Sequence, residues 1–135
     1  MNAELQQIAR HCLEGAERNA ITFPQIVGLL ADAGFDNYLV DYRRDLATYY
    51  HRDSDSITLP THASEVPIPP AFDTAAIQSA IRDAQAQVPG YTYLGFCERV
   101  RAAGCAGYMV SIIGRRALYF GRTAETHVEL FPTPA

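Results

Sequence analysis

Arginine, histidine and glutamate side chains gather in the last third of the chain, where they accompany a tyrosine. The members of this run that could do chemistry are Arg115, Arg116, Tyr119, Arg122, His127 and Glu129. An arginine presents a rigid fork of N–H donors that suits a carboxylate or a phosphate, while histidine and glutamate can transfer protons. The run therefore predicts a ligand-binding site for a small anion, with or without enzymatic activity.

Strand geometry decides whether these side chains can meet. His127 and Glu129 are two residues apart, so both point to one side of a strand. A hairpin with residues 117–120 would bring one of them close to an arginine. The alternative is an ordinary cross-strand ion pair, with a hydrogen-bonded histidine on a solvated face of the sheet.

Other candidate motifs are weaker. The stretch His51-Arg52-Asp53-Ser54-Asp55 has too few oxygen ligands for a hard cation, so we interpret it as a polar turn and expect no metal. The thiols of Cys12, Cys97 and Cys105 lie among apolar neighbours without a CxxC pair, as is typical of reduced core cysteines. Phosphate-loop, dinucleotide-binding, serine-hydrolase and zinc-protease signatures do not occur in the sequence. We therefore assign no catalytic residue and no cofactor.

Composition excludes several classes of function. The 135 residues carry a net charge of −4 and a pI near 5.5, which argues against binding to nucleic acid. Apolar runs are too short to span a bilayer, and the first residues lack the pattern of a secretory signal. With reduced thiols, these features favour a cytoplasmic protein without a membrane partner.

An internal repeat governs how the elements are arranged. Residues 22–52 align with residues 92–122 at an offset of 70, and eight of the 31 pairs are identical, where about two are expected by chance. The identical pairs are Thr22/Thr92, Ala33/Ala103, Gly34/Gly104, Tyr38/Tyr108, Val40/Val110, Ala47/Ala117, Tyr49/Tyr119 and Arg52/Arg122. We expect a single domain of two repeats, at about 1–59 and 73–132, joined by a proline-rich linker at 60–72.

Each repeat has the pattern of two helices followed by three strands. Helices are expected at about 3–18, 22–34, 74–87 and 92–104, and strands at 38–42, 46–50, 57–59, 108–113, 117–120 and 127–130. Short turns between strands favour antiparallel pairing. The fold class is therefore α+β, a tandem duplication of an ααβββ unit with pseudo-two-fold symmetry. The sequence leaves open whether the two sheets are fused or packed on each other.

Tyrosine supplies most of the aromatic character, with eight tyrosines and no tryptophan. Tyr38, Tyr49, Tyr108 and Tyr119 recur at equivalent positions of the two halves. Such repetition favours packing in the core, where the ring is buried and the hydroxyl reaches a partner. An aromatic binding surface is the alternative.

The C-terminal run also resembles a known family. The spacing of Gly104–Tyr108, Gly114–Arg122 and His127–Pro132 is similar to that of the YbcV-like family of small bacterial proteins of unknown function. The helix start at Thr22-Phe23-Pro24 and the segment Asp45–Tyr50 resemble it as well, so that the similarity covers nearly the whole chain. Some members carry the label phage envelope protein. The resemblance implies a small cytoplasmic protein, sometimes linked to a prophage, with no assigned reaction and no catalytic residues.

These observations favour a non-enzymatic binding or interaction protein, prophage-derived if the resemblance holds. The repeat leaves strand edges that a second copy or a protein partner can close, so we expect a homodimer or a protein partner. The rival hypothesis is the small-molecule or anion site on the C-terminal hairpin. It requires that the side chains of the hairpin converge in one concave pocket.

Overall fold

The computed structural model describes residues 1–132 and contains the predicted order of elements twice. The first half comprises α1 (Ala3–Glu17), α2 (Phe23–Ala33), β1 (Phe35–Asp41), β2 (Leu46–His51) and β3 (Ser56–Pro60). The second half comprises α3 (Thr74–Ala86), α4 (Tyr93–Ala102), β4 (Cys105–Ser111), β5 (Arg116–Gly121) and β6 (Thr126–Leu130). The α+β class and the repeated ααβββ pattern are confirmed.

Local sequence signals explain where α2 begins and ends. Thr22 accepts a hydrogen bond from the Gln25 amide, and the Gln25 side chain accepts one from the Thr22 amide, which forms a capping box. Gly34 ends the helix with φ at +89°, a left-handed conformation that favours glycine. Strand β1 starts directly at Phe35, three residues earlier than the alternating pattern predicts, because Phe35 already pairs with His51.

The two halves share one six-stranded antiparallel sheet in the order β3-β2-β1-β4-β5-β6. At its centre β1 pairs with β4, and Leu39 lies opposite Met109, its own counterpart at an offset of 70. Tyr38 then faces Val110, and Val40 faces Tyr108. The pseudo-two-fold axis therefore passes through the Leu39–Met109 pair, and the sheets are fused rather than stacked.

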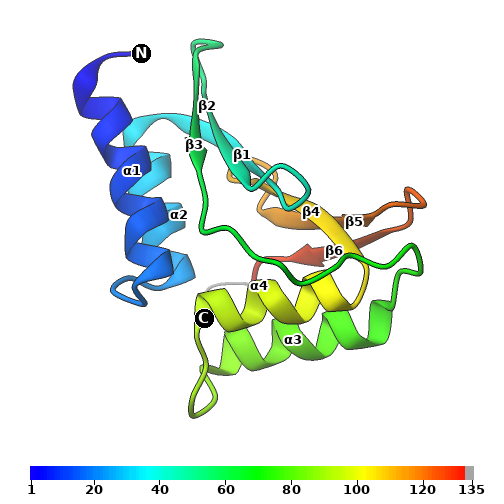
Figure 1. The fold of residues 1–135 in the computed structure, drawn as a ribbon. Coiled ribbons are helices and arrows are strands. Elements are labelled where there is room, and N and C mark those ends of the chain that lie inside the picture. Colours follow the sequence, from blue (N-terminus) through cyan, green and yellow to red (C-terminus); the bar gives the residue numbers. More distant parts are fainter. Residues whose placement is uncertain (133–135) are drawn as a thin grey trace.

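All four helices contribute to one core on one face of this sheet. Figure 1 shows α1 with α2 and α3 with α4 as two packed pairs, with the green segment after β3 running across α4. The repeated tyrosines Tyr38, Tyr49, Tyr108 and Tyr119 are all buried in this core. Their burial agrees with the prediction of core packing. The linker 60–72, which is the green segment of Figure 1, lies over the region where the two halves meet.

Two glycines offer a matched test of where the backbone has no room for a Cβ. A Cβ on Gly104, where φ is +94°, would overlap the carbonyl oxygen of Ala71 in the linker. On Gly28, inside α2, a Cβ would meet nothing within 4 Å. We expect Gly104→Ala to lower the free energy of unfolding by at least about 2 kcal/mol, and Gly28→Ala to raise it by about 0.5–1 kcal/mol. Urea unfolding of both variants measures this, and a Gly104→Ala variant as stable as the parent would contradict it.

Candidate functional site

The C-terminal hairpin brings together three of its six candidate residues. Tyr119 pairs with His127 across β5 and β6, and the two ring centroids are 6.5 Å apart. His127 Nε2 lies 3.1 Å from Glu129 Oε2. Tyr119 is buried against the helices, so His127 and Glu129 also occupy the helix-facing side of the sheet.

The three arginines of the hairpin contact other groups. The Arg115 guanidinium lies over the Phe131 ring, 5.5 Å from its centroid. Arg116 Nε donates to the carbonyl of Gly114, and Arg122 Nη1 donates to the carbonyl of Ile68, both at 3.0 Å. Among the contacts of residues 1–132, none joins an arginine of this run to His127 or Glu129. The structure thus groups Tyr119, His127 and Glu129 without a guanidinium beside them.

The repeat supplies an internal comparison for this histidine–glutamate pair. Ile57 and Leu59 occupy the equivalent positions on β3, and Leu59 is buried. The fold therefore accepts two aliphatic side chains where the second half has His127 and Glu129. The polar pair is an addition of the second half rather than a requirement of the sheet.

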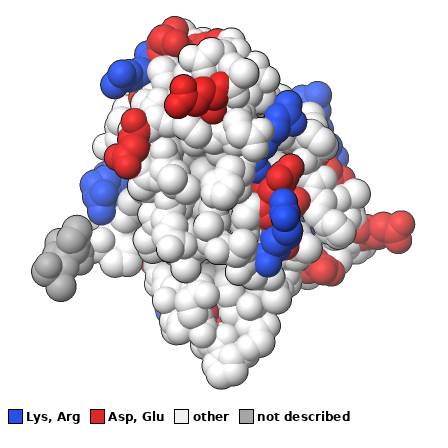
Figure 2. Space-filling model, turned by 90° about the vertical axis from the view of Figure 1, so that its left-hand side faces the viewer, with Lys and Arg blue, Asp and Glu red and all other residues white. Residues whose placement is uncertain are grey.

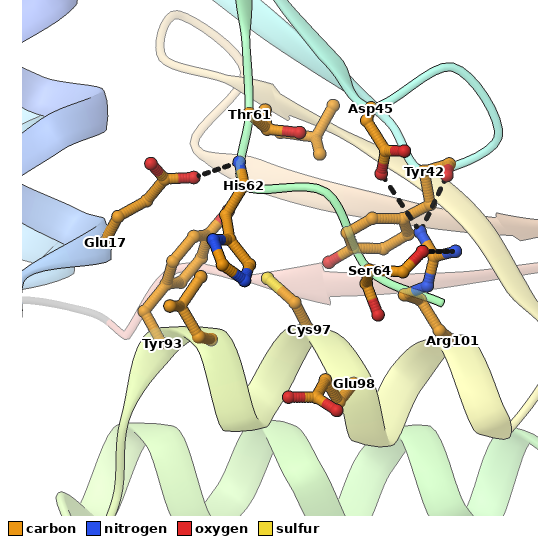
Figure 3. Close-up of a pocket in the computed structure, with 12 residues that line it drawn as sticks. Glu17, Tyr42, Asp45, Thr61, His62, Ser64, Tyr93, Cys97, Glu98 and Arg101 are labelled. Carbon is orange, nitrogen blue, oxygen red and sulfur yellow. Dashed lines mark hydrogen bonds and ion pairs between the residues drawn. The ribbon is translucent and has the colours of Figure 1, made fainter. Parts of the chain in front are cut away.

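A second feature, which we call the inner cavity, lies between α4, β1 and the linker. Its volume is about 20 Å³, and its polar lining includes Glu17, Tyr42, His62, Tyr93, Cys97 and Arg101. Figure 3 shows Glu17 and Tyr93 on one side, Tyr42 and Arg101 on the other, and Cys97 between them. A cavity of this size holds one group as large as a water molecule.

Arg101 fastens the linker to the sheet beside the inner cavity. Its side chain is buried and donates to three backbone carbonyls, those of Tyr42 at 2.7 Å, Val66 at 3.0 Å and Ser64 at 3.2 Å. Nη1 also lies 3.5 Å from a carboxylate oxygen of Asp45. The buried charge is thus balanced by an acid and by carbonyl dipoles, which is the condition under which a buried arginine is tolerated.

Tyr42 brings an unsatisfied hydroxyl to the same cavity. Tyr42 is only 5% exposed, and its hydroxyl has no hydrogen-bond partner among residues 1–132, a property that it shares with Asn37 Oδ1 alone. By contrast, the Tyr93 hydroxyl is hydrogen-bonded to that of Tyr108 at 2.6 Å. The Cys97 thiol lies near the Tyr42 hydroxyl but does not complete a hydrogen bond with it. The Tyr42 hydroxyl is therefore a buried polar group without a partner in the protein.

Residues of the inner cavity also differ from their counterparts in the other repeat. Tyr42, Cys97 and Arg101 correspond, at the offset of 70, to Ile112, Val27 and Ala31. On the side of the core where Ile112, Val27 and Ala31 lie, Phe23 packs edge-on against Phe131, with ring centroids 5.4 Å apart. One side of the pseudo-symmetric core is thus apolar and the other polar. This difference between the aligned halves was visible in the sequence, and it was the signal that could have located the cavity.

A family model for proteins of unknown function, DUF1398, matches residues 11–129. The chain belongs to this family. The match runs from α1 to β6, so it includes the linker, the inner cavity and most of the C-terminal hairpin. No curated protein matches the chain. The family adds no reaction, ligand or residue role to the geometry.

The remaining candidate residues of this DUF1398 protein make contacts that stabilise the fold. His51 Nε2 contacts the carbonyl of Ala33 at the end of α2, and its Nδ1 lies 3.0 Å from Asp53. Among the described residues, no cluster of three or more histidine, cysteine or acidic side chains is placed to hold a metal. Nor does any helix of residues 1–132 have both the length and the apolar character needed to cross a membrane.

Burial also makes the three cysteines poor nucleophiles. It raises the pKa of the Cys12 and Cys97 thiols to about 11 and that of Cys105 to about 12. At neutral pH these groups are thiols rather than thiolates, so they lack the form that attacks a substrate.

The contacts of Arg101 generate a prediction about the linker. Arg101→Met leaves three buried carbonyls without their donor, so we expect the free energy of unfolding to fall by about 3 kcal/mol. The freed linker should also become a better substrate for a glutamate-specific protease at Glu65. Urea unfolding and the initial rate of cleavage measure the two effects. Arg82→Met, on the exposed surface of α3, is the matched control. Equal cleavage of the two variants would contradict the role given to Arg101.

Proposed function

We propose that this DUF1398 protein is a non-enzymatic binding protein that holds a small polar molecule at the inner cavity. The observation that carries the proposal is the Tyr42 hydroxyl, which is buried, belongs to a residue that lines the cavity and has no partner among the described residues. An unpaired buried hydroxyl costs about 1–3 kcal/mol. A polar atom of a ligand that enters the cavity would remove this cost.

The space outside the cavity supports a ligand larger than water. An open hollow of about 510 Å³, the outer hollow, lies against linker residues 62–67 and Glu98. His62, Ser64 and Glu98 line both the inner cavity and the outer hollow. One polar tip of a ligand would occupy the inner cavity, and the rest of the molecule would lie in the outer hollow.

Four of the surrounding groups, Tyr42, Tyr93, Cys97 and Arg101, are better suited to hydrogen bonding than to catalysis. Burial keeps Cys97 a thiol, and it raises the pKa of Tyr42 and Tyr93 well above the ordinary value of 10.0. The donors of Arg101 go to carbonyls and Asp45. At neutral pH these four groups can donate or accept hydrogen bonds, but they do not provide an ionised base or nucleophile.

The hairpin alternative has less support. An anion there would need a cation beside His127 and Glu129, whereas Arg115, Arg116 and Arg122 are engaged with a ring and with carbonyls. A YbcV-like relationship, a phage origin and a cytoplasmic location stay proposals that rest on the sequence alone.

Tyr42→Phe tests the binding proposal. The hydroxyl has no protein partner to lose and its burial is unfavourable, so the free energy of unfolding of the variant should equal that of the parent or exceed it by up to about 1–3 kcal/mol. It should lose the rise in melting temperature that a bound ligand gives the parent, where a ligand at about 100 times its Kd adds about 2.7 kcal/mol. Thermal-shift assays with amines, carboxylates, phosphate, sugars and nucleotides measure this.

Tyr93→Phe is the matched control, because it removes a hydroxyl that does have a partner and should cost about 1 kcal/mol. If Tyr42→Phe were as destabilising as Tyr93→Phe, the Tyr42 hydroxyl would have a structural role and the proposal would fail. A ligand that stabilises the parent and Tyr42→Phe equally would bind elsewhere.

We also propose that the chain self-associates through exposed apolar side chains of α2. Phe23 and Leu29 are 41% and 39% exposed, and Asp32 is the only charged residue of the helix. Figure 2 shows the side of the molecule on which α1 and α2 lie, with a broad uncharged area and charges gathered around it. Sedimentation equilibrium should show a dimer that Leu29→Glu converts to monomer. A parent chain that is monomeric at millimolar concentration would contradict this.

A further inference from the structure

Acidic side chains dominate the charge around the inner cavity. Glu17, Asp45 and Glu98 supply three carboxylates to its lining, against the single guanidinium of Arg101. Asp45 and Arg101 lie within 3.5 Å and offset each other. Two carboxylates, those of Glu17 and Glu98, then remain at the site. A cation lowers its electrostatic energy by entering such a place, and an anion raises it.

Arg101 does not alter this preference. Four of its N–H donors are used, three by backbone carbonyls and one by Asp45. A guanidinium has five N–H donors in total, so no pair of them is left to grip a carboxylate or phosphate. The Arg101 guanidinium therefore holds the linker in place and has no pair of N–H groups left for a ligand.

The groups that remain free are hydrogen-bond acceptors. Glu17 Oε2 accepts from the His62 amide at 2.7 Å, and the second carboxylate oxygen has no protein donor among the described hydrogen bonds. The oxygen of the Tyr42 hydroxyl is unpartnered as well. An ammonium group has three N–H donors and no acceptor, so it can donate to either of these oxygens.

The volume of the inner cavity limits which cations can enter it. The inner cavity has a volume of about 20 Å³, enough for one group of the size of water. A primary ammonium meets this limit, whereas a quaternary ammonium with its methyl groups does not. The outer hollow adds Glu65 to Glu98 and has no arginine in its lining, so it also favours a positively charged molecule.

We propose that the ligand is a small organic primary amine, with its ammonium group in the inner cavity, whose lining includes Glu17 and Tyr42, and its carbon chain in the outer hollow. This inference rests on the proposed function and names its ligand class. His62, Ser64 and Glu98 line both spaces, so they would lie beside the ligand where it passes from one space into the other.

Four probes of similar chain length test the chemistry of the ligand. We would titrate the intact protein with n-butylammonium, n-butanol, butyrate and butyltrimethylammonium at equal concentration and ionic strength. Amide chemical shifts of residues 61–66 and 93–98 report binding. We expect n-butylammonium alone to shift these amides in a saturable way.

Glu17→Gln separates charge from hydrogen bonding. The amide oxygen of glutamine still accepts from the His62 amide, so the contact with the linker is retained. Loss of one negative charge beside the ammonium should weaken n-butylammonium binding by about tenfold. Glu14→Gln, on the same helix but in an exposed pair with Arg18, should leave it unchanged.

The outcomes distinguish this inference from the function on which it rests. If n-butanol or butyrate binds at these amides and n-butylammonium does not, the amine class is wrong while the cavity remains a binding site. Equal binding of butyltrimethylammonium overturns the primary ammonium in the inner cavity. If none of the four probes shifts these amides, the proposal of an amine ligand is wrong. The Tyr42→Phe experiment then tests whether the cavity binds a ligand at all.

Discussion

The pairing of β1 with β4 is the interaction on which the rest of the structure depends. Each half by itself has a three-stranded sheet with an open edge, and open edges are poorly tolerated in isolated proteins. In this chain the two inner edges satisfy each other along Asn37–Asp41 and Gly107–Ser111. Because Leu39 faces its own counterpart Met109, this single register fixes the axis that relates the two helix pairs and the strand hairpins of the two halves.

Comparing equivalent positions across this axis shows which contacts both halves share and which side chains only one half has. Equivalent hydrogen bonds recur on both sides: Thr61 donates to the Asp45 carbonyl and Phe131 to the Arg115 carbonyl, each at 3.0 Å. Arg101 corresponds to Ala31, and Tyr42 corresponds to Ile112. Because the equivalent positions are apolar, the fold does not require these two polar side chains. The same comparison singles out His127 and Glu129 over Ile57 and Leu59.

Sequence reasoning predicted the local structure well because its signals are local. Thr22 with Gln25 marks a helix start, Gly34 a helix end, and alternation marks the strands. The fusion of the two sheets and the inner cavity could not be predicted in the same way. Both depend on contacts between distant residues, such as Arg101 with the carbonyls of Tyr42 and Ser64, and carbonyls leave no trace in side-chain patterns. For the same reason the sequence could not predict the contacts of the hairpin arginines Arg116 and Arg122, which donate to the carbonyls of Gly114 and Ile68.

The Leu39–Met109 pairing has a consequence for how such a chain can change. Two identical copies of one half, joined by the same register, would form a symmetric dimer in which any substitution appears at two places. A polar cavity in such a dimer would occur twice, and both faces of the core would lose their apolar packing together. Covalent fusion removes that constraint. Phe23 and Phe131 can keep one side of the core closed while Tyr42, Cys97 and Arg101 open the other.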